Sequence, residues 1–133
     1  MEFKTGDIIS AKRPNQIVTH KGIVLIIDDK KYIMHATNST QNDYGGCLVI
    51  EPIETFFSIR RFIKKQSTTL TNDIILNYFE KNKKLKFNHI FQNCEHFVYG
   101  CLNNNKGFSP QLIGYSILTI SIIILLASLS KKK

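Results

Sequence analysis

The first half of the chain alternates short β-branched runs with polar breaks, which is the pattern of strands joined by turns. The expected strands cover Asp7–Lys12, Ile17–Ile27, Tyr32–Thr37, Cys47–Ile53 and Ser58–Lys64. A polar turn over Asp28–Lys31 separates the second strand from the third and predicts a hairpin. The pattern therefore predicts a small antiparallel sheet.

The spacing of apolar residues changes to a helical period after Thr71. This residue offers an N-cap, and apolar side chains then recur on one helical face up to Phe79. A second helix is expected to begin at Asn93 or Cys94, with an apolar stripe that runs to Leu102. A sheet followed by helices predicts an α+β fold, and we assign residues 1–108 to one domain.

The C-terminal stretch is different in kind, because Leu112 to Leu129 contains no charged residue. About 18 uncharged positions are long enough to cross a bilayer core as a helix. A buried helix of a small domain would show a polar face, and this stretch shows none. The sequence therefore predicts a transmembrane helix over 111–130 with a basic tail at 131–133. We expect a single-pass tail anchor with the catalytic domain on the cytosolic side, in a host membrane if the protein is viral.

The composition adds a strongly basic balance and few cysteines. The formal net charge is +8, and lysine supplies most of the excess, which suits nucleic acid or an anionic membrane. No nucleic-acid-binding motif is present, so we expect no nucleic-acid partner. The 3 cysteines are widely spaced and form neither a disulfide framework nor a zinc pattern. The sequence therefore predicts free thiols, no metal and no cofactor.

The segment QNCEHFVYG over 92–100 places a cysteine at the expected start of a helix. Unpaired N–H groups and the helix dipole at this position are expected to lower the pKa of Cys94 and to hold an oxyanion. Such a nucleophile needs a base within hydrogen-bond reach. The motif therefore raises the question of which histidine serves Cys94.

Four histidines are available as the base. His96 lies two positions after Cys94, where helical side chains do not face each other, so it is expected to pack or to support. His89 precedes the helix without distinguishing context. His20 and His35 lie on neighbouring strands but are not directly opposite, so a bulge or strand tilt is needed to bring them together. Residue types alone leave ordinary packed thiols and imidazoles open as an alternative.

Four short motifs, taken in their order along the chain, resemble those of a known protein family. They read GDII, THKGIVL, YIMHAT and NCEHFV. Together they resemble the lecithin:retinol acyltransferase-like family, and most of all its H-Ras-like suppressor branch of small phospholipases A and acyltransferases. The resemblance covers essentially the whole chain, and NCEHFV is its most specific piece. It implies a permuted NlpC/P60 papain-like fold, in which the histidines precede the cysteine.

The resemblance also implies a role for each motif residue. Cys94 would be the nucleophile that accepts the acyl group. His20 would be the general base and then the acid, and His35 would be the third polar residue that orients His20. Asn93 and Glu95 would fix the helix start rather than take part in the chemistry.

The implied activity is that of a thiol-dependent phospholipase A1/2 or acyltransferase. It would remove an acyl chain from a membrane glycerophospholipid as a Cys94 thioester and pass it to water, an amine or an alcohol. A cysteine protease or isopeptidase of the papain-like superfamily would use the same chemistry and is the alternative. A non-enzymatic membrane protein is a third class, and the presence of all three site residues speaks against it. One departure concerns Lys21, which stands where the branch commonly has an aromatic residue.

Overall fold

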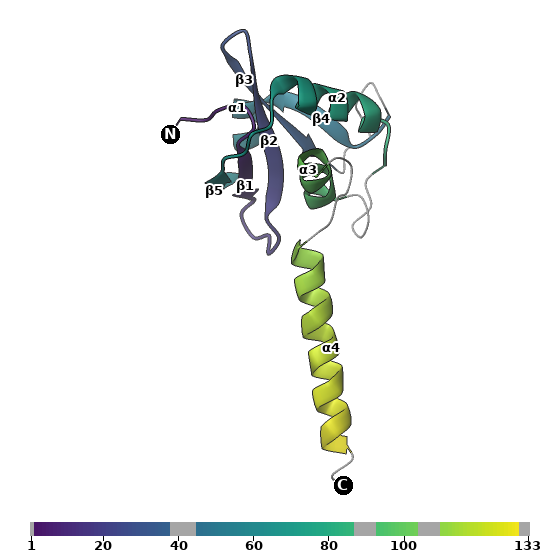
Figure 1. The fold of residues 1–133 in the computed structure, drawn as a ribbon. Helices are drawn as coiled ribbons and strands as arrows, with labels where there is room; N and C mark the ends of the chain where they lie inside the picture. The colour runs from purple at the N-terminus through teal and green to yellow at the C-terminus, as the bar shows by residue number, and fades with distance from the viewer. Residues whose placement is uncertain (1, 38–44, 87–92, 104–109, 131–133) are drawn as a thin grey trace.

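The computed structural model describes residues 2–37, 45–86, 93–103 and 110–130. Its strands form one antiparallel sheet in the order β4-β3-β2-β1-β5 (Figure 1). The strands are β1 (Ile8–Lys12), β2 (His20–Ile27), β3 (Lys30–Ala36), β4 (Leu48–Pro52) and β5 (Arg61–Gln66). The predicted α+β class with an antiparallel sheet is confirmed.

The hairpin between β2 and β3 turns through Asp28 and Asp29. Both residues have positive φ, 49° and 61°, as a two-residue type I′ turn requires, and aspartate tolerates this conformation better than most side chains. Ile27 pairs with Lys30 across the turn. The tight turn fixes the register of every later pair in the hairpin, including those at the candidate site.

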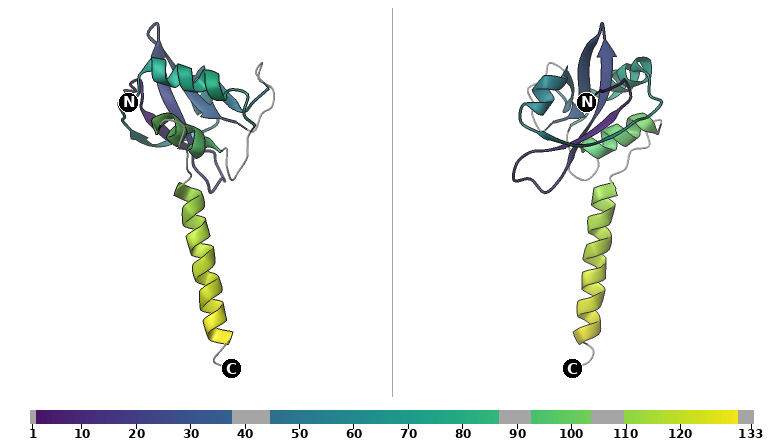
Figure 2. Two further views of the ribbon diagram at one scale, coloured as in Figure 1. Left: turned by 45° about the vertical axis from the view of Figure 1, so that its right-hand side comes forward. Right: turned by 90° about the vertical axis from the view of Figure 1, so that its left-hand side faces the viewer.

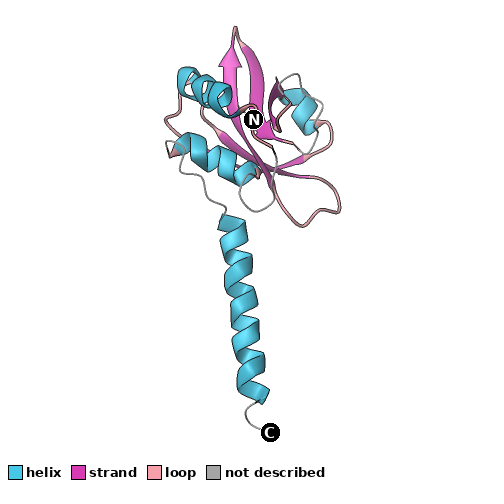
Figure 3. Cartoon of the chain, turned by 90° about the vertical axis from the view of Figure 1, so that its right-hand side faces the viewer, coloured by secondary structure: helices cyan, strands magenta, loops and turns pink. Residues whose placement is uncertain are grey.

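Three helices cover the two faces of the sheet. The short helix α1 (Ile53–Phe57) packs on one face, and α2 (Asn72–Asn82) and α3 (Cys94–Leu102) pack on the other (Figures 2 and 3). Thr71 caps α2, because its hydroxyl accepts a hydrogen bond from the N–H of Ile74 at 3.4 Å. The sheet is therefore the central layer, with a separate apolar core on each side.

Strand β2 contributes to both cores, because its side chains alternate between the two faces. Ile23 and Leu25 belong to the core beneath α2 and α3, and Val24 belongs to the core beneath α1. By the same alternation His20 shares the α1 face with Val24, and Lys21 shares the α3 face with Ile23. This alternation decides how the site is arranged.

Several predicted boundaries differ from the structure. The second strand begins at His20 rather than Ile17, because Ile17 lies in the preceding turn region with 85% of its surface exposed. The helix α1 was not predicted, because it is only five residues long and follows a strand of similar apolar character. The fifth strand begins at Arg61 rather than Ser58, since the chain first has to leave α1.

The last helix, α4 (Pro110–Ser130), extends away from the sheet domain (Figure 1). Among the helices of the described residues, none has both the length and the apolar character needed to cross a membrane. The predicted transmembrane helix over 111–130 and the predicted tail-anchor localisation are therefore wrong. The prediction relied on the absence of charged residues and treated hydroxyl-bearing positions as tolerable, since such hydroxyls bond to helix carbonyls, as Thr119 and Ser121 do in α4. The expected domain end at residue 108 and the tail at 131–133 lie outside the described residues.

Candidate active site

Three polar side chains form a hydrogen-bonded chain on the α1 face of the sheet. His20 Nε2 lies 2.9 Å from His35 Nδ1, and His35 Nε2 lies 2.7 Å from Glu51 Oε1. His35 pairs with Gly22, so His20, two residues before Gly22 in β2, lies diagonally across from His35. Diagonal neighbours on one face are within reach of long side chains. The two imidazoles therefore meet without the bulge that the sequence seemed to require.

The carboxylate of Glu51 decides which nitrogens carry protons. An ionised carboxylate can only accept, so His35 donates from Nε2. His20 Nε2 and His35 Nδ1 face each other, so one of them donates to the other and the tautomer of His20 follows from that of His35. The hydrogen bond from His35, with burial acting against it and the charge of His35 assisting, holds the pKa of Glu51 below its usual value. In the tautomer with the His35 proton on Nε2 alone, His20 donates from Nε2 and keeps a lone pair on Nδ1.

Aromatic and cationic groups surround the two imidazoles. The ring of Phe56 is fully buried and lies 5.7 Å from the His20 ring and 5.1 Å from the His35 ring. Arg60 stacks on Phe56 at 4.6 Å and donates from Nη1 to the Phe56 carbonyl at 3.1 Å. Burial, and then the charges of His35, Arg60 and Arg13, lower the pKa of His20 to about 2. His20 is therefore neutral in the resting protein, which is the form that can take up a proton.

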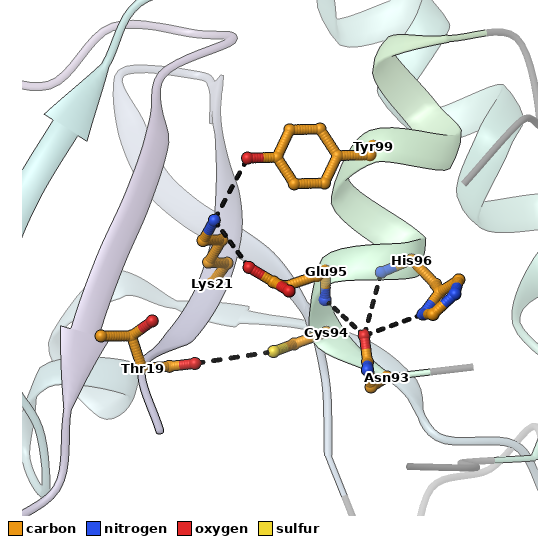
Figure 4. A network of polar contacts seen from close by, with 7 residues as sticks. All are labelled: Thr19, Lys21, Asn93, Cys94, Glu95, His96 and Tyr99. Atoms are coloured by element: carbon orange, nitrogen blue, oxygen red, sulfur yellow. Dashed lines mark hydrogen bonds and ion pairs between the residues drawn. The ribbon is translucent and has the colours of Figure 1, made fainter. Parts of the chain in front are cut away.

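Cys94 is the first residue of α3 and approaches the start of β2 from the other side. Its Sγ lies 3.9 Å from the carbonyl oxygen of Thr19, and the N–H of Lys21 also interacts with the sulfur (Figure 4). Thr19 and Lys21 are the residues on either side of His20. The sulfur therefore contacts the backbone on both flanks of the candidate base, and 7% of Cys94 is exposed.

The predicted depression of the Cys94 pKa is wrong. Burial raises the pKa of the thiol, and the N–H groups of Lys21 and Glu95 only partly oppose this effect. The helix start supplies the expected N–H groups, but desolvation of a buried thiolate outweighs them. Both candidate groups, the thiol of Cys94 and the imidazole of His20, are therefore neutral at rest. Proton transfer therefore has to accompany nucleophilic attack.

Asn93 caps α3 and sets the position of the cysteine. Its Oδ1 accepts from the N–H of Glu95 at 3.0 Å and from that of His96 at 3.1 Å, and it also contacts the His96 ring at 3.0 Å. His96 points away from Cys94 in Figure 4 and supports the cap, in line with the expectation that it is not the base. His89 lies outside the described residues.

Glu95 does more than fix the helix start. It is 2% exposed and forms an ion pair with Lys21, whose Nζ also lies 3.2 Å from the hydroxyl of Tyr99. The sequence analysis named Glu95 for the helix start and Lys21 only as a departure from the resembled branch, and it did not name Tyr99. It also missed Glu51 and Arg60, although an acidic residue inside the apolar run CLVIEPI was a visible signal for Glu51. No local pattern marked Arg60 or Tyr99.

The other two cysteines provide a contrast with Cys94. Cys47 and Cys101 are free and buried, and burial raises the pKa of Cys47 to about 11 and that of Cys101 to about 12. Cys94 differs from both, because its sulfur contacts the backbone of Thr19 and Lys21 on either side of the candidate base His20.

Comparison of this chain with protein-family models, with curated proteins and with solved structures gives no match. The resemblance to the lecithin:retinol acyltransferase-like family therefore rests on the four motifs and their order. Within the described ranges, no group of three or more histidine, cysteine, aspartate or glutamate side chains is arranged to hold a metal ion.

Proposed function

We propose that the protein transfers acyl groups through a thioester on Cys94, and that it acts as a phospholipase A or acyltransferase on glycerophospholipids. Two observations support this proposal: the polar chain from Glu51 through His35 to His20, and the Cys94 sulfur that contacts the backbone of Thr19 and Lys21 on either side of His20. A nucleophile, a base and a group that orients the base are the three parts of thiol-dependent acyl transfer.

The first step forms a tetrahedral intermediate. The S–H bond of Cys94 breaks as its proton moves to Nδ1 of His20 and the sulfur bonds to the ester carbonyl. Asn93 and its carbonyl occupy the N–H groups of Glu95, His96 and Phe97. The N–H of Cys94 is the remaining first-turn donor to which no described residue is bonded, and we assign the oxyanion to it.

The second step releases the lysophospholipid. The ester C–O bond breaks, and His20 returns its proton to the departing alkoxide oxygen. Water or an amine or alcohol then attacks the thioester, and His20 accepts the proton of that acceptor. The C–S bond then breaks, His20 returns its proton to the sulfur, and the product is a fatty acid or an acylated acceptor. Glu51 stabilises the transient positive charge on His20 through His35, whose Nε2–H donates to Glu51 and whose Nδ1 faces His20.

The choice of a lipid substrate rests on the resemblance of the motifs and on one surface feature. Ile17 and Val18 are exposed by 85% and 49%, two to three residues before His20. Arg13 lies in the same connection between β1 and β2. An apolar tip with a cation beside the catalytic pair suits a substrate with an acyl chain and an anionic headgroup.

The test measures acyl release by the full-length chain from phosphatidylcholine in mixed detergent micelles, with the acyl chains radiolabelled. We expect lysophosphatidylcholine to form with the wild type and not with Cys94→Ala. Cys101→Ala is the matched control, because it removes another buried thiol from the same helix. Its activity should stay within a few-fold of wild type.

Two results would count against the proposal. Equal lysolipid release by wild type and Cys94→Ala would show that the thiol does no chemistry. No release from any phospholipid, together with cleavage of a peptide or ubiquitin-like amide that needs Cys94, would favour the protease alternative.

A further inference from the structure

A buried ion pair lies directly behind the two proposed catalytic residues. Lys21 follows His20 in β2, and Glu95 follows Cys94 in α3. Lys21 Nζ is 2.9 Å from Glu95 Oε1, and the two side chains are only 10% and 2% exposed (Figure 4). The pair therefore joins the strand that carries the base to the helix that carries the nucleophile, at the next residue of each.

Tyr99, one helical turn after Glu95 in α3, also contacts this pair. Its hydroxyl lies 3.2 Å from Lys21 Nζ, and its ring centroid lies 5.0 Å from the same atom. Glu95 and Tyr99 are four residues apart and share one face of the helix. Two contacts from one helix face to a single ammonium fix both the height and the rotation of α3 against β2.

The energetics of such a pair point to a positional role. Moving two charges out of water costs several kcal/mol per ion in general, and an apolar pair of similar volume often stabilises a fold as well or better. A surface pair of the same chemistry contributes about 0–1 kcal/mol. A buried ion pair differs from an apolar contact because it fixes a specific register between two elements.

We propose that Lys21 and Glu95, with Tyr99, are positioning residues that hold Cys94 in register with His20 and balance the charge beside its sulfur. This inference rests on the proposed thiol chemistry, in which these two residues act together. Lys21 is the position that departs from the resembled branch, so the device belongs to this chain rather than to the motif.

The charges beside the sulfur support the second half of this role. The carboxylate of Glu95 raises the pKa of Cys94, and the ammonium of Lys21 lowers it. Both the Glu95 hydrogen bond and the Tyr99 hydrogen bond keep the pKa of Lys21 above its usual value despite burial, so the ammonium stays charged. Arg60, in the turn after α1, also interacts electrostatically with Cys94. His20 is neutral and adds no charge. Removing Lys21 alone would leave a buried carboxylate as the nearest charge to the thiol.

The experiment follows carboxamidomethylation of Cys94 by iodoacetamide between pH 6 and 11 in the full-length chain, with the modified peptide identified by mass spectrometry. Lys21→Met should move the midpoint of the rate profile upward and slow the reaction at pH 8 roughly tenfold, as one pKa unit requires. Glu95→Gln should move the midpoint downward. The double variant Lys21→Met/Glu95→Gln should return toward wild type.

Three controls separate the possible outcomes. Lys83→Met removes the surface pair with Glu80 and should leave the profile unchanged. Lys21→Arg keeps the charge and should restore the profile and the lysolipid activity. Tyr99→Phe removes only one hydroxyl, so it tests the network if Lys21→Met fails to fold, and it should slow alkylation by a few-fold at pH 8.

Profiles of folded Lys21→Met, Glu95→Gln and Tyr99→Phe that overlay the wild-type profile would overturn this inference. The readout needs no substrate, so it is independent of the proposed activity. If the shifts appear while no phospholipid is cleaved, the proposed substrate fails and the positioning role stands. If lysolipid forms but the profiles overlay, the positioning role fails and the proposed function stands.

Discussion

The two faces of the sheet each bury a polar network at the start of β2, and the networks differ in kind. On the α1 face, two imidazoles and the Glu51 carboxylate form a chain along which a proton can be held or passed. On the α3 face, Lys21 and Glu95 form a pair of fixed charges. Alternation along one strand places them back to back, at His20 and Lys21. The contrast suggests that one strand separates proton transfer from alignment by assigning each to its own face.

The largest expected effect is the loss of the base on the α1 face. His20→Asn removes the nitrogen that takes the Cys94 proton, and general base catalysis contributes about 10²–10⁴-fold. We therefore expect lysolipid release to fall by that factor, with KM changed much less than kcat. Steady-state kinetics on mixed micelles check this. A kcat within twofold of wild type would mean that the imidazole chain does not serve the thiol.

Replacing the carboxylate on each face sharpens the comparison. In Glu51→Gln the amide can donate to His35 Nε2, which places the proton of His35 on Nδ1, reverses the hydrogen bond between the two imidazoles and puts the His20 proton on Nδ1. We expect kcat to fall about tenfold to a hundredfold, as when an imidazole loses its orienting partner. Glu95→Gln should instead shift the thiol alkylation profile downward in pH. Measuring kcat and the alkylation profile in both variants checks this. If both variants change kcat and the alkylation profile in the same way, the two faces do not have separate roles.

The two networks should also respond to pH at opposite ends of the scale. His20 titrates near 6.5 when unfolded and near 2 when folded, so between these values the unfolded chain binds more protons. Its contribution to the unfolding free energy is complete above about pH 6.5 and is lost as the pH falls, with a slope of at most about 1.4 kcal/mol per pH unit. Lys21 has a raised pKa, so its contribution is present below its ordinary value of 10.5 and is lost as the pH rises through the folded value.

Urea denaturation across a pH series measures both effects. The difference between wild type and His20→Asn should change between pH 6.5 and pH 4 and stay constant from pH 7 to 9. In the alkaline range, the difference between wild type and Lys21→Met should stay constant from pH 8 to about pH 10 and change above about pH 10.5. A His20→Asn difference that is flat across the acid range would contradict a buried neutral imidazole.

The parts of this arrangement that are local were predictable from the sequence. Alternation and turn residues indicated the β2–β3 hairpin, and Asn93 before an apolar period indicated the start of α3. Cys94, His20 and His35 were named from their motifs, and the structure places His20 beside His35 and Cys94 at the flanks of His20. The roles of these residues in catalysis remain proposals.

The remaining parts depend on tertiary contacts that a linear pattern does not contain. Glu51 reaches His35 because β3 pairs with β4 in one register, and Lys21 meets Glu95 across 74 positions of sequence. The sign of the Cys94 pKa shift was mispredicted because the helix start is visible in sequence and the burial of the sulfur is not. The C-terminal span was mispredicted because a count of charges is a coarse measure of apolar character.

The central claim is that Cys94 carries an acyl group with His20 as its base, and one measurement addresses it most directly. Full-length wild type, Cys94→Ala, Cys101→Ala and His20→Asn are mixed with a phosphatidylcholine of defined acyl chains, quenched in acid within seconds, and weighed intact by mass spectrometry. We predict a mass increase of one acyl group that maps to Cys94 and is removed by hydroxylamine in wild type and Cys101→Ala. It should be absent in Cys94→Ala and greatly slowed in His20→Asn. An adduct that survives in Cys94→Ala, or one that forms equally fast in His20→Asn, would contradict the account.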